Sequence, residues 1–168
     1  MKESAPVAFK YKGAALFVDD IDRARAFYEG LLGLVAETDH GGYVTYGGGL
    51  ALWASEASGE SIFSRRVERA ERGTGEMELY FETDDIAGSY ALLERAGTAM
   101  IHPVQEEPWG QRTFRCYDPD GHIVEVGEPM RAVVERLAAA GVPLENIARR
   151  TTLPMELILQ IIGYPRFC

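Results

Sequence analysis

The sequence predicts an α+β fold made of two tandem βαβββ modules, followed by a C-terminal helical segment. Three observations support this prediction. A β-prone run, an Asp-Asp pair and an amphipathic helix occur twice, and the Asp pairs at residues 19–20 and 84–85 lie 65 residues apart. Short β-prone runs separated by turn residues follow each helix. Beyond residue 128 the apolar residues take helical spacing.

The first module begins with a strand and a capped helix. Residues 12–18, KGAALFV, have the composition of a short buried strand. Asp19 and Asp20 offer an N-cap, and helical spacing follows over residues 21–32 until Gly33 ends the helix. Three short strands, separated by glycine-rich turns, are expected at residues 34–37, 43–46 and 50–54.

A polar segment bounded by glycines separates the two modules. We expect residues 57–72 to form a loop, with one helical turn around residues 62–67. The second module then repeats the order of the first. Its predicted strand, helix and three further strands cover residues 76–83, 86–96, 98–104, 112–117 and 122–126.

The last two strands should form a tight hairpin. Asp118-Pro119-Asp120-Gly121 supplies the residues that a β-turn requires at each position. The turn fixes the register of the hairpin and therefore the placement of Glu125, the one carboxylate of the last strand. Each module alone would expose one face of a four-stranded sheet, so the modules must pair within one chain or between two.

Residues 129–168 are predicted to be a separate helical appendage. Helices are expected at residues 130–140, with Val133, Val134 and Leu137 on the apolar face, and at residues 143–150 and 154–162. The last two are similar to a compact helix-turn-helix. Their predicted apolar seam consists of Ile147, Ala148, Leu153, Leu157 and Ile161.

The appendage offers little to a nucleic acid. A recognition helix needs basic or amide side chains that face the groove, but the last helix has only Gln160, and Glu156 would oppose phosphate. We therefore do not expect DNA binding. Packing on the rest of the protein or on a partner subunit is the favoured interpretation.

Composition restricts the class of protein further. The chain has 168 residues and a net charge of −9, which argues against general nucleic-acid binding and permits a cationic ligand. No apolar run approaches the roughly 20 residues that span a bilayer, and the N-terminus lacks a signal-peptide core. The two cysteines make no disulfide framework. We expect a cytoplasmic protein with no membrane partner.

Three sequence motifs now indicate a family. These are LFVDDIDRARAFYEGLLGL in the first module, and FETDDIAGSYALLERAG and PWGQRTFRCYDPDGHIVEV in the second. Over residues 11–128, with modules at about 11–56 and 75–128, the chain resembles the vicinal oxygen chelate superfamily, which includes glyoxalase I, extradiol dioxygenases and the bleomycin-resistance proteins. The resemblance implies that each module curls its sheet into half of a barrel-shaped cup.

The resemblance also implies where a metal would bind. Metal-dependent members take one ligand from the first strand and one from the last strand of each module. In the second module these positions hold Glu78 and Glu125, but in the first they hold Gly13 and either Ala51 or Leu52. Two carboxylates without imidazole or thiolate make a weak site for Zn²⁺, Fe²⁺ or Ni²⁺. We therefore expect an incomplete metal site and no cofactor.

Alternatives for these two carboxylates stay open. Mg²⁺ or Mn²⁺ could use Glu78 and Glu125 with waters, and His40, His102 or a second subunit could complete a site. The two carboxylates could instead act as a catalytic acid and base, since neighbouring like charges separate their pKa values. Pairing with Arg115 or Arg112 is an equally good interpretation.

Strand alternation predicts the lining of the cup. If Glu78 points inward, Tyr80 and Glu82 do too, and in the first strand Gly13, Ala15 and Phe17 face the same way. Cys116 should pack against a helix. The predicted ligand-binding residues are Phe17, Trp53, Tyr80, Glu82, Trp109, Arg115 and Tyr117.

The sequence-based hypothesis is a binding protein of the glyoxalase/bleomycin-resistance type. It would hold a small organic molecule, cationic by charge complementarity, and would work as a homodimer. A metal-dependent lyase or dioxygenase of the same superfamily is the first alternative. A ligand-responsive transcriptional regulator that uses the C-terminal helices is the second.

Overall fold

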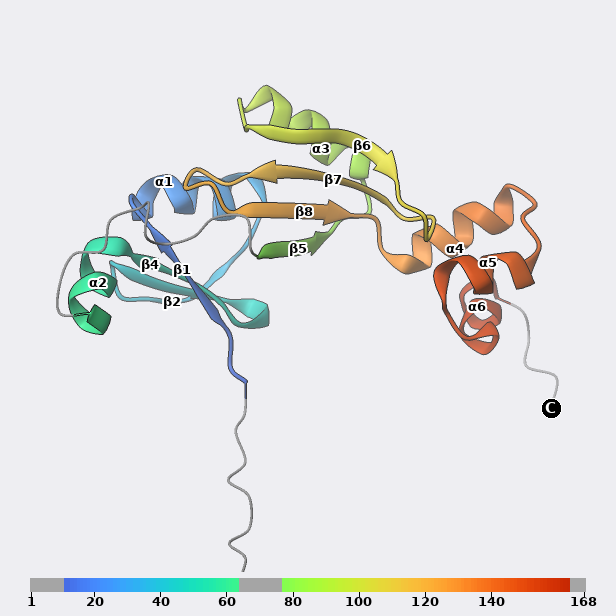
Figure 1. The fold of residues 1–168 in the computed structure, drawn as a ribbon, viewed down its shortest axis with the longest axis horizontal. Coiled ribbons are helices and arrows are strands. Elements are labelled where there is room, and N and C mark those ends of the chain that lie inside the picture. The colour runs from blue at the N-terminus through green and yellow to red at the C-terminus, as the bar shows by residue number, and fades with distance from the viewer. Residues whose placement is uncertain (1–10, 64–76, 164–168) are drawn as a thin grey trace, which may run out of the picture. The chain divides into compact units, whose positions relative to one another are not determined.

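The computed structural model describes residues 11–63 and 77–163. The chain divides into two compact units, Met1–Arg72 and Gly73–Cys168, and each contains one βαβββ module (Figure 1). The duplicated pattern of the sequence is therefore confirmed as a duplicated fold.

The first module forms a four-stranded sheet with the order β1-β4-β3-β2. The outer strand β1 runs parallel to β4, and the remaining pairs are antiparallel. A helix follows β1 and covers the face that carries the buried side chains of Leu16, Val18 and Leu52. The strands are β1 (Ala14–Val18), β2 (Ala36–Asp39), β3 (Tyr43–Tyr46) and β4 (Leu50–Ala54).

The helix of the first module begins and ends where the sequence predicts. Asp20 caps α1 (Ile21–Arg25) by accepting a hydrogen bond from the Arg23 amide at 3.0 Å. The helix continues as a π-helical segment, η1 (Ala26–Leu31), and Gly33 follows with a positive φ of 73°.

Two predictions for the first module need correction. The second strand starts at Ala36 instead of residue 34, and Val35 is exposed. The polar segment does not begin as a loop, because Ser55–Phe63 forms helix α2 directly after β4. The helical turn expected at residues 62–67 lies mostly outside the described residues. Polar composition misled the prediction, because Ser and Glu are acceptable in an exposed helix.

The second module repeats the same topology, with the strand order β5-β8-β7-β6 and a parallel β5–β8 pair. Asp85 caps α3 (Ile86–Arg95) by accepting from the Gly88 amide at 2.9 Å. The strands are β5 (Glu78–Glu82), β6 (Met100–Glu106), β7 (Arg112–Tyr117) and β8 (Ile123–Gly127).

The predicted hairpin joins β7 to β8. The buried Asp118 carboxylate accepts from the amides of Asp120 at 2.9 Å and His122 at 2.8 Å, and Gly121 takes a φ of 87°. Phe114 and Cys116 face α3 and are buried, whereas Arg115 alternates to the other face. The expected packing of Cys116 is confirmed, and burial followed by the charge of Asp118 raises the pKa of its thiol to about 11.

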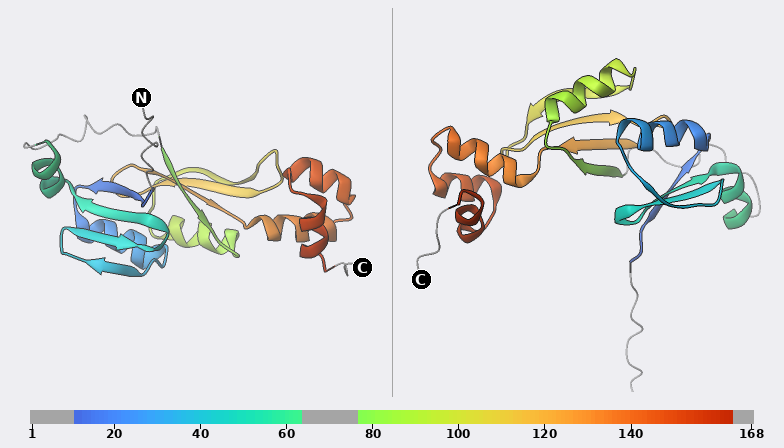
Figure 2. Two further views of the ribbon diagram at one scale, coloured as in Figure 1. Left: turned by 90° about the horizontal axis from the view of Figure 1, so that it is seen from below. Right: turned by 180° about the vertical axis from the view of Figure 1, so that it is seen from behind.

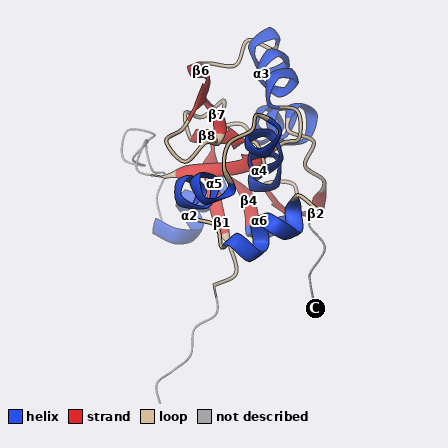
Figure 3. Ribbon diagram, turned by 90° about the vertical axis from the view of Figure 1, so that its right-hand side faces the viewer, coloured by secondary structure: helices blue, strands red, loops and turns tan. Residues whose placement is uncertain are grey.

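The C-terminal segment forms three helices in the second unit, α4 (Met130–Ala139), α5 (Leu144–Thr151) and α6 (Met155–Ile161) (Figure 3). Its buried core consists of Val133, Val134, Leu137, Ile147 and Ile158, with Ala148, Leu153 and Ile161 packed around it.

Leu157 was predicted in the apolar seam of these helices, and that prediction was wrong. Leu157 is 40% exposed, and its neighbour Ile158 is fully buried. Among the residues that the structure describes, no helix has the length and apolar character needed to cross a membrane.

Candidate functional site

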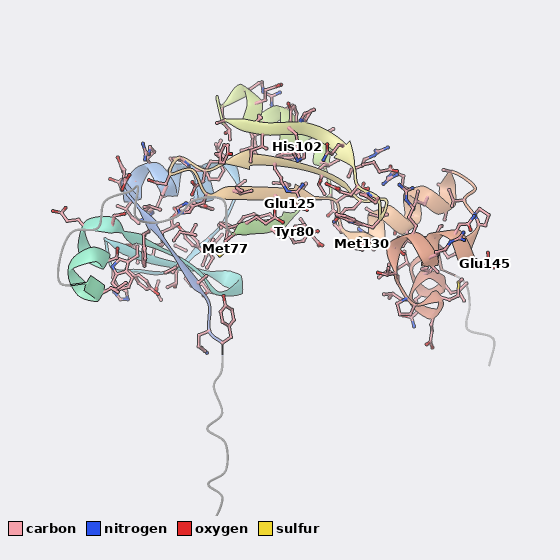
Figure 4. All side chains as sticks on the ribbon, in the orientation of Figure 1. Met77, Tyr80, His102, Glu125, Met130 and Glu145 are labelled. Atoms are coloured by element: carbon pink, nitrogen blue, oxygen red, sulfur yellow. The ribbon has the colours of Figure 1, made fainter. Side chains whose placement is uncertain are left out.

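Charged and aromatic side chains gather on the face of the second sheet that lies away from α3. Register places Tyr80 of β5 and Arg115 of β7 on either side of Glu125 in β8, and His102 of β6 opposite Arg115. Figure 4 labels Tyr80, Glu125 and His102 on these strands. One row across the sheet therefore draws a residue from each of the four strands.

Arg115 is the centre of this row. Its Nε lies 2.9 Å from Oε2 of Glu78, its Nη1 lies 3.3 Å from Oε1 of Glu107, and its Nη2 bonds to the Glu125 carboxylate. Nη1 also lies 3.4 Å from Nε2 of His102. One guanidinium thus forms ion pairs with three carboxylates. When all three are ionised, the cluster of Arg115 with these carboxylates carries a net charge of −2. Such a face attracts cations.

The three carboxylates do not titrate alike. The hydrogen bond from Arg115 lowers the pKa of Glu78. Burial raises the pKa of Glu125 despite the opposing charge of Arg115. For Glu107 burial acts to raise the pKa, but hydrogen bonds from Thr113, Gln105 and Arg115 together lower it. Glu125 is therefore the member of the cluster that takes up a proton most readily.

A chain of hydrogen bonds links the predicted aromatic residues beside this cluster. Trp109 Nε1 donates to Gln111 Oε1 at 2.9 Å, and Gln111 Nε2 donates to the Tyr80 hydroxyl at 2.7 Å. The Tyr80 hydroxyl donates in turn to Glu82 Oε1 at 3.0 Å. Burial raises the pKa of Tyr80 to about 12, so the hydroxyl keeps its proton. Tyr80 and Trp109 are 48% and 38% exposed, so both rings can meet a ligand.

Gln111 is a functional candidate that sequence reasoning missed. Its side chain is buried and joins two exposed rings, that of Trp109 in the turn before β7 and that of Tyr80 on β5. A buried amide must satisfy both its donors and its acceptor. Its position directly after the Pro-Trp-Gly turn was the one available signal.

Tyr117 lies at the other end of the same face. It shares a face with Arg115, two residues away, and pairs with Ile123, which also pairs with Glu78. Tyr117 is 41% exposed. The site residues predicted on strands of the second module thus lie on one face, with Glu82 toward one end and Tyr117 at the other. Trp109 lies in the turn before β7 and is linked to this face through Gln111.

The first module carries an aromatic cluster on the corresponding face. The ring centroids of Phe17 and Trp53 lie 6.2 Å apart, and those of Tyr43 and Trp53 lie 5.4 Å apart, both with edge-to-face geometry. Phe17 and Trp53 were predicted. Tyr43 was not, although register places it directly opposite Trp53.

Strand register also settles which residue of the first module corresponds to Glu125. Glu125 lies opposite Tyr80, two residues after Glu78, and Ala51 lies opposite Ala15, two residues after Gly13. The counterpart is therefore Ala51 and not Leu52.

The position of Gly13 cannot hold a metal ligand without rearrangement. A Cβ added to Gly13 would lie 2.0 Å from the carbonyl oxygen of Gly49. Glu78 and Glu125 are both bonded to Arg115, whose positive charge opposes a metal cation at that place. Within the described ranges, 11–63 and 77–163, no three His, Cys, Asp or Glu side chains form a group suited to a metal. The donor set therefore does not fit the four-ligand metal site of the superfamily.

Residues 11–131 match the glyoxalase-like domain family. The chain belongs to this family. A solved structure of a protein of unknown function from Agrobacterium tumefaciens str. C58 is 36% identical, with a TM-score of 0.67, and the match covers 73% of this chain and 96% of that one. The resemblance to the vicinal oxygen chelate superfamily inferred from the sequence is thereby confirmed.

Two further solved structures are similar to this glyoxalase-like chain. A lactoylglutathione lyase from Agrobacterium tumefaciens is 27% identical, with a TM-score of 0.52 and coverage of 74% of this chain and 96% of that one. A member of the glyoxalase/bleomycin resistance protein/dioxygenase superfamily from Sphaerobacter thermophilus is 25% identical, with a TM-score of 0.53 and coverage of 72% and 98%. No curated protein matches the chain.

Proposed function

We propose that this glyoxalase-like protein binds a small organic cation on the face of its second sheet that lies away from α3, without a divalent metal. The observation that carries the proposal is the pairing of Arg115 with Glu78 and Glu125, the two residues that would otherwise be metal ligands. The cluster keeps excess negative charge, and exposed aromatic rings lie beside it. Aromatic faces and carboxylates together favour a cationic aromatic molecule over a neutral one.

The test uses a charged and a neutral form of one ring system. N-methylacridinium should quench the tryptophan fluorescence of the protein, whereas acridine, at a pH where it is neutral, should bind at least about tenfold more weakly because it lacks the cation–π and charge terms. Trp109→Phe should remove most of the quenching. Trp53 was predicted to bind the ligand, but it belongs to the first module and lies outside the proposed site. Trp53→Phe is therefore the matched control and should retain the quenching. Equal affinity for the two probes would contradict the proposal.

A metal-dependent lyase is the second candidate, favoured by the 27% identical lactoylglutathione lyase. Metal analysis of protein purified without chelator or nickel resin separates the two. Stoichiometric metal that is lost in Glu125→Ala would replace the binding proposal with the enzyme. The homodimer predicted from the sequence stays a prediction, to be tested by the mass of the protein in solution.

A further inference from the structure

The turn between β6 and β7 lies beside the C-terminal helices (Figure 2). Two arginines of these helices donate hydrogen bonds to it. Arg150 of α5 donates from Nε to the Pro108 carbonyl at 3.0 Å and from Nη2 to Glu106 Oε1 at 2.7 Å. Arg136 of α4 donates to the Gly110 carbonyl at 2.5 Å and to Glu106 Oε2 at 2.9 Å. The arginines therefore fix two backbone carbonyls of the turn and share one carboxylate. Trp109 lies between those two carbonyls.

A second connection runs from Arg136 to the hydrogen-bonded chain at the site. Arg136 also bonds to the buried Glu128 carboxylate. The backbone carbonyl of Glu128 accepts from Gln111 Nε2 at 2.7 Å. Gln111 is the residue that joins Trp109 to Tyr80. Glu128 alone therefore separates Arg136 of the appendage from Gln111, the side chain that bonds to both Trp109 and Tyr80.

The turn also packs directly on α4. Gly110 has a φ of 91°, and a Cβ at this position would lie 3.3 Å from Leu137 Cδ1 and 3.4 Å from Val133 Cγ1. Leu137 and Val133 belong to the buried core of the appendage. The backbone of Gly110, next to Trp109, therefore packs against the same apolar cluster that holds the three helices together.

We propose that the C-terminal helices are part of the ligand site, with Arg136 and Arg150 as positioning residues that set Trp109 and Gln111 beside Tyr80. The proposal rests on the function proposed above and extends it to a segment outside the two modules. Charged hydrogen bonds to main-chain carbonyls are strong and directional, so they restrict where the turn can lie. A turn fixed in advance loses less conformational entropy when a ligand binds.

The first experiment needs no ligand. The chain has two tryptophans, so Trp53→Phe leaves Trp109 as the sole reporter. In that background Arg136→Gln and Arg150→Gln should increase the quenching of Trp109 by acrylamide, because the turn is released. Arg149→Gln is the matched control, since Arg149 is the neighbour of Arg150 on α5 and its side chain bonds within the helix to Asn146. It should leave the quenching unchanged.

A further variant covers the case in which an arginine substitution prevents folding. Glu106→Gln leaves both arginines in place and removes the negative charge that they share. Glu106→Gln should also increase the acrylamide quenching of Trp109, by less than Arg136→Gln or Arg150→Gln does. Far-ultraviolet circular dichroism identifies the variants that keep their helices.

The second experiment titrates the same variants with N-methylacridinium. Arg136→Gln and Arg150→Gln should weaken binding about tenfold, the factor expected for loss of one charge-assisted hydrogen bond. Arg149→Gln should bind as the parent does. Unchanged quenching and unchanged affinity in folded Arg136→Gln, Arg150→Gln and Glu106→Gln would overturn the positioning role. Increased quenching in a protein whose parent does not bind the probe would support the positioning role and overturn the proposed function.

Discussion

Arg115 and Glu125 lie directly opposite each other on β7 and β8, and the guanidinium of one is bonded to the carboxylate of the other. This pair occupies the place where a member of the superfamily with a metal would offer its ligand from the last strand. Arg115 is the cationic partner of both Glu78 and Glu125, the two candidate metal ligands of the second module. The same relationship accounts for the net negative charge left on the face, because one arginine does not neutralise three carboxylates.

The first prediction concerns Arg115 itself. Arg115→Met should lower the free energy of unfolding at neutral pH by about 2–4 kcal/mol, because the buried Glu125 carboxylate would lose its cationic partner. The loss should shrink in acid, where the carboxylates become protonated. Chemical denaturation at several pH values measures both effects.

Arg112→Met is the control for that measurement. Arg112 is in the same strand, and its side chain is exposed. Its substitution should change the free energy of unfolding by less than about 0.5 kcal/mol. Equal effects of the two substitutions at every pH would show that Arg115 holds no buried carboxylate.

The residues of the site were largely predictable from the sequence, but their partners were not. Alternation along β5 and β7 placed Glu78, Tyr80 and Arg115 on one face, because a strand has a fixed period of two. The choice between a metal and Arg115 as partner depends on distances between strands, which alternation does not give. Gln111 and Tyr43 were missed for the same reason, since each matters through a neighbour on another strand.

The second prediction separates the two glutamates by the pH dependence of stability. The pKa of Glu78 is lowered from its ordinary value of 4.5, so its contribution is present above that pH and is lost as the pH falls through the lowered value. Glu78→Gln should therefore cost up to about 1 kcal/mol at neutral pH, because the pair is partly exposed. The cost should vanish in acid.

Glu125 should show the opposite trend. Its pKa is raised by burial, so its contribution is complete below 4.5 and is lost as the pH rises through the raised value. Relative to the parent, Glu125→Gln should become progressively more stable as the pH rises. Denaturation curves from pH values of about 3 to 8 test the pair. Parallel curves for both variants would contradict the assignment.

The third prediction concerns the close approach of Gly13 to Gly49. Gly13→Ala should destabilise the protein by about 2–4 kcal/mol, because its Cβ would collide with a backbone carbonyl that cannot move aside freely. Gly13→His should be at least as destabilising and should not create metal binding. Thermal denaturation with and without added Zn²⁺ tests both statements.

Gly47→Ala is the control for this position. It lies in the turn that contains Gly49, and the nearest atom to its added Cβ is Glu37 Oε1 at 3.6 Å, an ordinary contact. Its effect should stay below about 1 kcal/mol. If Gly13→His bound Zn²⁺ and gained thermal stability from it, the first module would still be competent as a metal half-site.

The last prediction follows from the corrected core of the appendage. The predicted apolar seam included Leu153, Leu157 and Ile161, which lie four residues apart, but Leu153 precedes α6 and does not share its periodicity. In the structure Ile158 is fully buried in one core with residues of α4 and α5, whereas Leu157 is 40% exposed. Ile158→Ala should therefore cost about 2–4 kcal/mol through the cavity that it leaves. Leu157→Ala should cost less than about 1 kcal/mol. A larger loss of stability for Leu157→Ala than for Ile158→Ala in urea denaturation would restore the seam predicted from the sequence.

The same two variants should also differ in the fluorescence of Trp109. Val133 and Leu137 belong to the core that contains Ile158, and both lie next to Gly110. Ile158→Ala should therefore increase acrylamide quenching of Trp109 in the Trp53→Phe background, whereas Leu157→Ala should not.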